Sequence, residues 1–306
     1  MTRSSLRCRL PSSRVCGPVD VSLGQPRVTG QEWRIFALDT GSSVLDRSML
    51  TYGRAFGERV QIPRVIWVLR GPTTVVVDTS VPTHGRAAEF VGESFERANY
   101  QLPAHALRAA GVDPKDVEYV LLTHLHWDHA GNCGLFPHAR VIVQKAELAY
   151  AIAPGRYFGK SFLSPLAGWD QPPYLVPNLE CVEGQAPIAP GVDVVPAMGH
   201  TPGSQAVLVE TALGLVGIAG DAICTYENLR LDVPPGFHVN VDASVETMDR
   251  LRVATDVLLP SHDYAVFTDG PITEISAIHA ELGSDHPRIR DVTGVADAGT
   301  GPIASK

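Results

Sequence analysis

Short apolar runs rich in valine, isoleucine and leucine alternate with turn residues through the middle of the chain. Such runs are typical of strands that are buried in a β-sheet, where successive side chains point to opposite faces. The runs predict strands at 33–38, 65–69, 74–77, 117–122, 140–143, 192–195, 206–209, 215–219 and 257–259.

Apolar residues recur at helical spacing in further segments, and a glycine follows two of them, Gly111 and Gly283. Glycine is a common residue just beyond the end of a helix, because it adopts left-handed backbone angles easily. The predicted helices lie at 103–110, 145–152, 244–255 and 272–282. Strands mixed with helices indicate an α/β fold, and since no linker divides the middle of the chain, we predict one domain over residues 31–283.

Three segments lack periodic apolar spacing. Residues 1–30 and 284–306 predict a flexible N-terminal arm and a flexible C-terminal tail. Segment 153–178 combines five prolines with five aromatic residues and has no regular period. Long irregular insertions of this kind are often functional, so we predict a lid-like insertion; the alternative is a surface loop whose aromatic side chains pack on the domain.

Composition and charge narrow the choice of partners. The chain has 306 residues, is 44% hydrophobic and carries a formal net charge of -8. An acidic balance argues against nucleic acid as a partner, and no run approaches the roughly 20 apolar residues of a membrane helix. The N-terminus carries arginines but no apolar core, so we expect no signal peptide and a cytoplasmic location. We expect a small-molecule substrate, no nucleic acid and no membrane partner, and leave a homodimer open.

Four potential metal ligands lie within six residues, directly after an apolar strand: His124, His126, Asp128 and His129. In an extended chain, His124 and His126 point the same way and can reach one ion. The turn that follows can direct Asp128 and His129 toward a second ion. Histidine nitrogen and aspartate oxygen are suitable ligands for zinc.

Three more candidates, His200, Asp221 and His262, each follow an apolar strand. Taken alone, each is more often a structural, surface or turn residue. Loops at one edge of a sheet can nevertheless converge on one cleft, and a carboxylate such as Asp221 can bridge two cations. We therefore predict that the seven residues bind two divalent metal ions, with zinc as the favoured metal.

Residues 124–129, which read HLHWDH, match without a gap the HxHxDH motif of the metallo-β-lactamase superfamily. His200, Asp221 and His262 resemble the later ligands of that family. The resemblance covers roughly residues 33–282. It implies a four-layered αββα sandwich with the metal ions in a cleft along one edge of the sheets.

Within the superfamily, the sequence looks most like the lactonase branch, which includes quorum-quenching acyl-homoserine lactone lactonases and 4-pyridoxolactonases. The supporting features are the 74–79 run that ends in Asp78 and Thr79, the continuation through 127–132, and Asp263 directly after His262. In acyl-homoserine lactonases a tyrosine is expected three residues after the bridging aspartate. Here that position is Cys224, and the nearest tyrosine is Tyr226. We therefore expect a lactone other than a simple acyl-homoserine lactone.

The resemblance implies a hydrolase that opens a lactone by attack of a hydroxide that two metal ions generate from water. The first ion is expected at His124, His126 and His200, the second at Asp128, His129 and His262, with Asp221 between them. Asp128 is the candidate for proton transfer, and Tyr226 and Cys224 are candidates for contact with the substrate carbonyl.

The candidate substrate pocket consists of aromatic residues of the 153–178 insertion and one histidine: Tyr157, Phe158, Phe162, Trp169 and His238. Fold and ligands do not fix the substrate. A thioesterase or another ester or cyclic-amide hydrolase of the same superfamily is therefore an alternative. A second alternative is a non-catalytic, metal-binding member of the fold.

Overall fold

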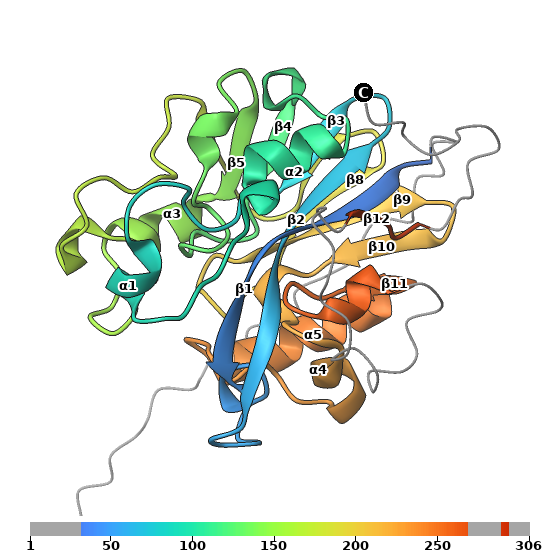
Figure 1. Cartoon of the computed structure of the whole chain (residues 1–306). Helices are drawn as coiled ribbons and strands as arrows, with labels where there is room; N and C mark the ends of the chain where they lie inside the picture. The colour runs from blue at the N-terminus through green and yellow to red at the C-terminus, as the bar shows by residue number, and fades with distance from the viewer. Residues whose placement is uncertain (1–31, 269–288, 294–306) are drawn as a thin grey trace, which may run out of the picture.

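Two β-sheets form the centre of the protein in a computed structural model that describes residues 32–268 and 289–293 (Figure 1). The strands of the first sheet are β1 (Arg34–Asp46), β2 (Arg59–Arg70), β3 (Thr74–Val77), β4 (Tyr119–Leu121), β5 (Arg140–Gln144), β6 (Leu179–Val182) and β12 (Ile289–Asp291). The strands of the second sheet are β7 (Ala186–Ala189), β8 (Val192–Pro196), β9 (Gln205–Thr211), β10 (Gly214–Ile218) and β11 (Val257–Leu259).

Both sheets are mixed. The first has the order β12-β1-β2-β3-β4-β5-β6, antiparallel from β12 to β3 and parallel from β3 to β6. The second has the order β11-β10-β9-β8-β7, with one parallel pair, β10 and β11. The loops that follow β4, β10 and β11 carry candidate metal ligands.

The largest core cluster lies between the two sheets. Trp67 and Val75 of the first sheet pack there with Val207 and Ile218 of the second. Because side chains alternate along a strand, Val68 points to the opposite face, where it joins a cluster beneath α2 (Pro103–Ala109) and α3 (Lys145–Ile152).

The outer face of the second sheet is also covered. Leu208 of β9 packs with Met248 and Leu251 of α5 (Val241–Ala254). In Figure 1, α1 (Ala87–Val91), α2 and α3 lie on the side of the first sheet, and α4 (Tyr226–Leu231) and α5 on the side of the second. The order of layers is helix, sheet, sheet, helix, which confirms the predicted αββα sandwich.

Each predicted strand corresponds to a strand of the structure, and so do the predicted helices at 103–110, 145–152 and 244–255. The helix expected at 272–282 and the arm expected at 1–30 lie outside the described residues. The sequence did not predict β6 and β7, or the second half of β1. In β1 the register shifts between Asp39 and Ser42, and polar residues interrupt the apolar pattern there.

Of the predicted flexible tail, the structure describes residues 289–293. Within 284–306, β12 pairs with β1, and Val292 and Thr293 are buried. A strand of three residues is too short to show a sheet period in the sequence, and its pairing with β1 becomes visible only in the structure.

The 153–178 insertion contains no α-helix or strand, only the short 3-10 turn Pro165–Ala167. Phe162 and Tyr174 are buried, whereas Tyr157 is 80% exposed. The backbone N–H of Trp127 donates to the Ser161 carbonyl at 2.8 Å, so the insertion contacts the loop that carries the HxHxDH motif. Among the described residues, no helix is both long and apolar enough to cross a membrane.

Candidate metal centre

All seven candidate ligands are buried and lie at one edge of the two sheets. Residues 124–129 form the loop after β4, and His200 lies in the turn between β8 and β9. Asp221 stands in the 3-10 turn Gly220–Ala222 after β10, and His262 follows β11. The structure therefore brings together residues that are up to 138 positions apart in the sequence.

The first group of ligand atoms consists of three imidazole nitrogens. His126 Nδ1 lies 3.1 Å from His124 Nε2 and 2.9 Å from His200 Nε2. Burial lowers the pKa of all three histidines, for His124 and His126 to well below the usual value, and neighbouring histidines add to this effect for both. The neutral ring is therefore favoured, and three nitrogen lone pairs converge on one point.

The second group combines a carboxylate with two histidines. Asp128 Oδ2 lies 3.5 Å from His129 Nε2 and 3.7 Å from His262 Nε2. Burial alone would lower the pKa of His129, but the carboxylates of Asp221, Asp128 and Asp78 raise it well above the usual value. The negative charge around His129 is thus strong enough to attract a cation.

Asp221 lies between the two groups. Its Oδ2 is 3.3 Å from His200 Nε2, while its Oδ1 is 3.2 Å from His129 Nε2 and 3.1 Å from His262 Nε2. The Ser261 hydroxyl donates to Oδ1 at 2.6 Å and holds the carboxylate in this orientation. One oxygen therefore faces each group of ligand atoms, as a bridging carboxylate requires.

Backbone carbonyls orient two of the histidines. His200 Nδ1 lies 2.7 Å from the Phe237 carbonyl oxygen, and His262 Nδ1 lies 3.1 Å from that of Pro63. Because a carbonyl only accepts hydrogen bonds, each Nδ1 must carry the proton, which leaves the Nε2 lone pair directed into the site.

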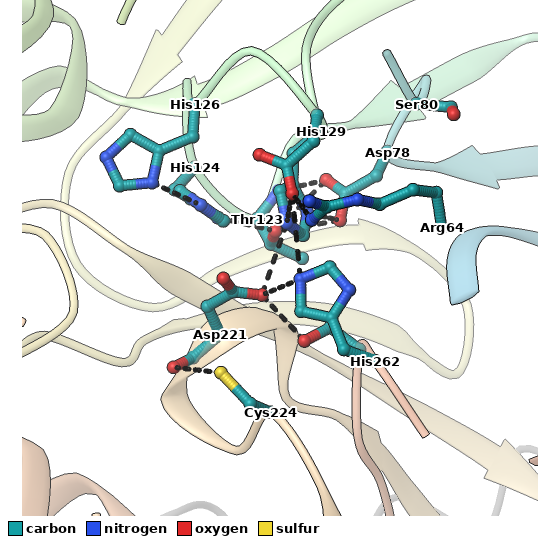
Figure 2. A network of polar contacts seen from close by, with 12 residues as sticks. Arg64, Asp78, Ser80, Thr123, His124, His126, His129, Asp221, Cys224 and His262 are labelled. Atoms are coloured by element: carbon teal, nitrogen blue, oxygen red, sulfur yellow. Dashed lines mark hydrogen bonds and ion pairs between the residues drawn. The ribbon is translucent and has the colours of Figure 1, made fainter. Parts of the chain in front are cut away.

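Asp78 orients two more ligands from the end of β3 (Figure 2). His129 Nδ1 donates to Asp78 Oδ2 at 2.8 Å. The Thr123 hydroxyl donates to the same carboxylate, so its oxygen is left to accept from His124 Nδ1 at 3.1 Å. Asp78 has a φ of 60°, a left-handed angle that non-glycine residues rarely adopt and that often marks functional sites.

These observations fit divalent metal ions. His129 Nε2 is buried and, within the described part of the chain, makes no hydrogen bond. Unprotonated imidazole nitrogens and carboxylate oxygens are the usual ligands of zinc and related cations, and the hydrogen bonds to the outer ring nitrogens are typical of metal-bound histidines.

Arg64 of β2 is a member of the site that sequence reasoning missed. Its buried guanidinium forms ion pairs with Asp128 and, at 2.9 Å, with Glu93. Burial would raise the pKa of Asp128, but the charge of Arg64 outweighs it, and this pKa lies well below the usual value. A signal was present, since an arginine inside the apolar strand 59–70 needs a buried partner.

The two residues predicted to contact the substrate carbonyl are packed among apolar side chains. The Cys224 thiol lies with Leu45, Leu50 and Ile62, and burial raises its pKa well above the usual value. Tyr226 is part of the core between the sheets. Neither belongs to the groups of ligand atoms. Their contact with a substrate therefore stays a prediction.

Three of the five predicted pocket residues lie on the side of the first group of ligands. The ring of Phe162 is 4.5 Å from that of His126. The rings of Phe158 and Tyr157 are 5.4 Å and 6.5 Å from that of Phe237, which is itself 5.8 Å from His126. We call Tyr157, Phe158, Phe162 and Phe237 the aromatic wall; nothing in the sequence pattern had indicated Phe237.

The other two predicted pocket residues pack elsewhere. Trp169 contacts the ring of Phe90 in α1 at 5.1 Å. His238 contacts the ring of Tyr52 at 5.0 Å, and its Nδ1 lies 2.8 Å from the Pro235 carbonyl oxygen. Both side chains thus have packing partners outside the aromatic wall.

Comparisons with known proteins agree with this geometry. The profile of the metallo-beta-lactamase superfamily matches residues 61–262. An N-acyl homoserine lactonase of Bacillus cereus is 30% identical over 232 residues, which cover 72% of this chain and 87% of that protein. An N-acyl homoserine lactonase of Bacillus thuringiensis is 29% identical over the same length.

Solved structures give the same result. A mutant of B. thuringiensis AiiA with N-decanoyl-L-homoserine bound at the active site has a TM-score of 0.65 and 26% identity, over 76% of this chain and 93% of that chain. An N-acyl homoserine lactone hydrolase with N-hexanoyl-L-homoserine at its catalytic metal center has a TM-score of 0.64 and 25% identity, over the same 76% and 93%. With its motif, ligand geometry and relatives in agreement, the chain belongs to the metallo-beta-lactamase superfamily, as a metal-dependent hydrolase that is most similar to the lactonase branch.

Proposed function

We propose that this protein is a lactonase that binds two divalent metal ions, with zinc as the native metal. The observation that carries the proposal is the position of Asp221, whose two oxygens face two separate groups of ligand atoms. The first site consists of His124, His126 and His200, and the second of Asp128, His129 and His262. The donor set and the lactonase relatives support this assignment.

When bound, the two cations supply Lewis acidity, which lowers the pKa of a water molecule from 15.7 to about 7 and offsets the negative charge that develops on the substrate oxygens. The residues of the chain hold and move the proton. Arg64 keeps the Asp128 carboxylate charged and lowers its pKa, so Asp128 would hold the proton of the attacking water only briefly before passing it on. As the new C–O bond forms and the ring C–O bond breaks, that proton passes to the ring oxygen, which leaves as a hydroxyl group.

The aromatic wall supports a substrate with an apolar or aromatic portion. Phe162, which is buried, packs on the ring of His126, and the partly exposed Phe237 lies beside it. A substrate whose carbonyl reaches the first site would place its neighbouring atoms against Phe237. The tyrosine expected in acyl-homoserine lactonases is replaced by Cys224. We therefore propose a lactone other than a simple acyl-homoserine lactone, with an attached or fused aromatic ring.

A substrate panel tests the proposal. We would compare kcat/KM for an aliphatic lactone, a ring-fused aromatic lactone, an acyl-homoserine lactone, a glutathione thioester and a β-lactam under one set of metal and pH conditions. We expect the aromatic lactone to be hydrolysed fastest. A thioester or β-lactam turned over tenfold faster than every lactone, a difference of about 1.4 kcal/mol, would overturn the lactonase assignment.

A pair of variants tests the aromatic wall. Phe237→Leu should lower kcat/KM for the aromatic lactone more than for the aliphatic one, because only the former needs the ring of Phe237. Phe90→Leu is the matched control, since Phe90 packs on Trp169 outside the wall. If Phe237→Leu lowered kcat/KM equally for both lactones, the aromatic wall would have no role in selecting an aromatic substrate.

A further inference from the structure

Glu147 is a fully buried carboxylate in α3, and its hydrogen-bond partners are neighbours in sequence of candidate metal ligands. It accepts three hydrogen bonds. Its Oε1 accepts from the backbone N–H of Leu125 at 2.9 Å. Its Oε2 accepts from the Thr201 hydroxyl at 2.6 Å and from the backbone N–H of Gly203 at 3.1 Å.

These three donors belong to two loops that carry all the ligands of the first site. Leu125 stands between His124 and His126, and Thr201 directly follows His200. His126 and His200 are 74 residues apart in the sequence, yet a single carboxylate joins the loops that carry them. The three nitrogens of the first site must stay about 3 Å apart to share one ion, so their spacing depends on how these loops are held together.

The loop of His200 also touches the backbone of α3. A Cβ atom at Gly203 would lie 2.0 Å from the Glu147 nitrogen and 2.5 Å from its Cα, so only glycine allows this approach. A second connection, from Gln205 N–H to the Thr123 carbonyl at 2.8 Å, lies on the strand side of the ligands. On the side of α3, Glu147 forms hydrogen bonds with both of these loops.

A buried carboxylate is unfavourable for folding unless strong partners compensate it. The hydrogen-bond donors to Glu147 are neutral groups, and no lysine or arginine among the described residues forms an ion pair with it. Burial accordingly raises its pKa to about 7. Neutral donors therefore hold this carboxyl between the two loops, and a cation at the first site would favour its charged form.

We propose that Glu147 is a positioning residue of the first metal site, which fixes the spacing of His124, His126 and His200 by joining their two loops. This inference rests on the metal site of the proposed function. It predicts that the metal affinity of the first site depends on Glu147, whereas the metal affinity of the second site does not.

The test measures zinc affinity by competition with a chromophoric chelator, on folded protein at fixed pH. Glu147→Gln keeps the size of the side chain but removes the charge and turns one accepting oxygen into an N–H donor. We expect it to weaken the binding of one of the two zinc ions at least tenfold and of the other less than threefold. Glu227→Gln is the matched control, because Glu227 of α4 pairs with Arg47 and Thr51 outside the site, and it should change neither affinity.

The His200→Ala background identifies which site is affected. This variant lacks a ligand of the first site, so adding Glu147→Gln to it should change the remaining affinity less than threefold. An equal loss in both backgrounds, or equal weakening of both ions, would mean that Glu147 supports the whole fold and would overturn the inference.

Two variants of Thr201 keep the test decisive if Glu147→Gln does not fold. Thr201→Val removes the donor to Glu147 and should weaken the first site, whereas Thr201→Ser keeps a hydroxyl and should stay within threefold of wild type. Equal affinities of the two Thr201 variants would refute the positioning role. Wild-type protein that binds no zinc would refute the proposed function itself. If Glu147→Gln instead binds two zinc ions with the same affinities as wild type, only the role of Glu147 is refuted.

Discussion

Ionisation of Glu147 should make the metal-free protein less stable as the pH rises from 5 to 8. Burial raises the pKa of this carboxyl from 4.5 to about 7, although its three hydrogen bonds act in the opposite direction. The folded state therefore holds the proton more tightly than the unfolded state. The stabilising contribution is complete below about pH 4.5 and is lost as the pH rises through about 7.

The structure sets the size of this effect. The difference between 4.5 and about 7 corresponds to about 3 kcal/mol, because one pKa unit corresponds to about 1.4 kcal/mol. Most of this change in stability occurs between pH 5 and pH 8. Between pH 5 and pH 8 we expect the stability of Glu147→Gln relative to wild type to rise by about 2.5 kcal/mol, since glutamine does not titrate.

Urea denaturation of metal-free wild type and variant at pH 5, 6, 7 and 8 measures this difference. Neighbouring titratable groups such as His129 and Tyr174 are present in both proteins, so their contributions cancel to first order. Glu227→Gln is the control, because the pKa of Glu227 lies below 4.5 and outside the window, and its difference from wild type should stay flat. Parallel stability profiles of wild type and Glu147→Gln, constant within about 0.5 kcal/mol, would refute the reasoning.

Other consequences can be tested directly. Elemental analysis should find two metal ions per chain, and a strong chelator should remove both the ions and the activity; full activity without bound metal would contradict the proposed function. His200→Ala should lose metal and activity, whereas His84→Ala, at an exposed position, should keep its metal content. Arg64→Met should destabilise the metal-free protein by about 3 kcal/mol, because it leaves the buried Asp128 carboxylate without its partner, and by less with metal bound, as denaturation with and without zinc would show. Cys224→Ala should change kcat/KM less than threefold, because the thiol is packed among apolar side chains; a larger loss would support its contact with the substrate carbonyl.

Sequence patterns alone predicted most of the fold. Apolar runs and helical spacing located most of the strands and the helices α2, α3 and α5, but not α1 and α4, because a buried strand or an amphipathic helix needs a particular local pattern of side chains. The HxHxDH spacing likewise identified four candidate ligands in one loop. The order of the strands within each sheet and the short strands β6, β7 and β12 were not predictable in this way, since they depend on which edges meet.

The tertiary structure decided how the ligands are oriented and held. Arg64 meets Asp128 across 64 positions of sequence, and Glu147 meets Thr201 across 54. Phe237 reaches the ring of His126 although no local pattern distinguishes it. Cys224, a candidate for contact with the substrate carbonyl, packs with Leu45, Leu50 and Ile62, which are distant in the sequence. The local sequence determines which candidate ligands are present and how they are spaced along the chain. The partner that orients a buried group, or keeps it charged, comes from a distant segment, and only the folded chain brings the two together.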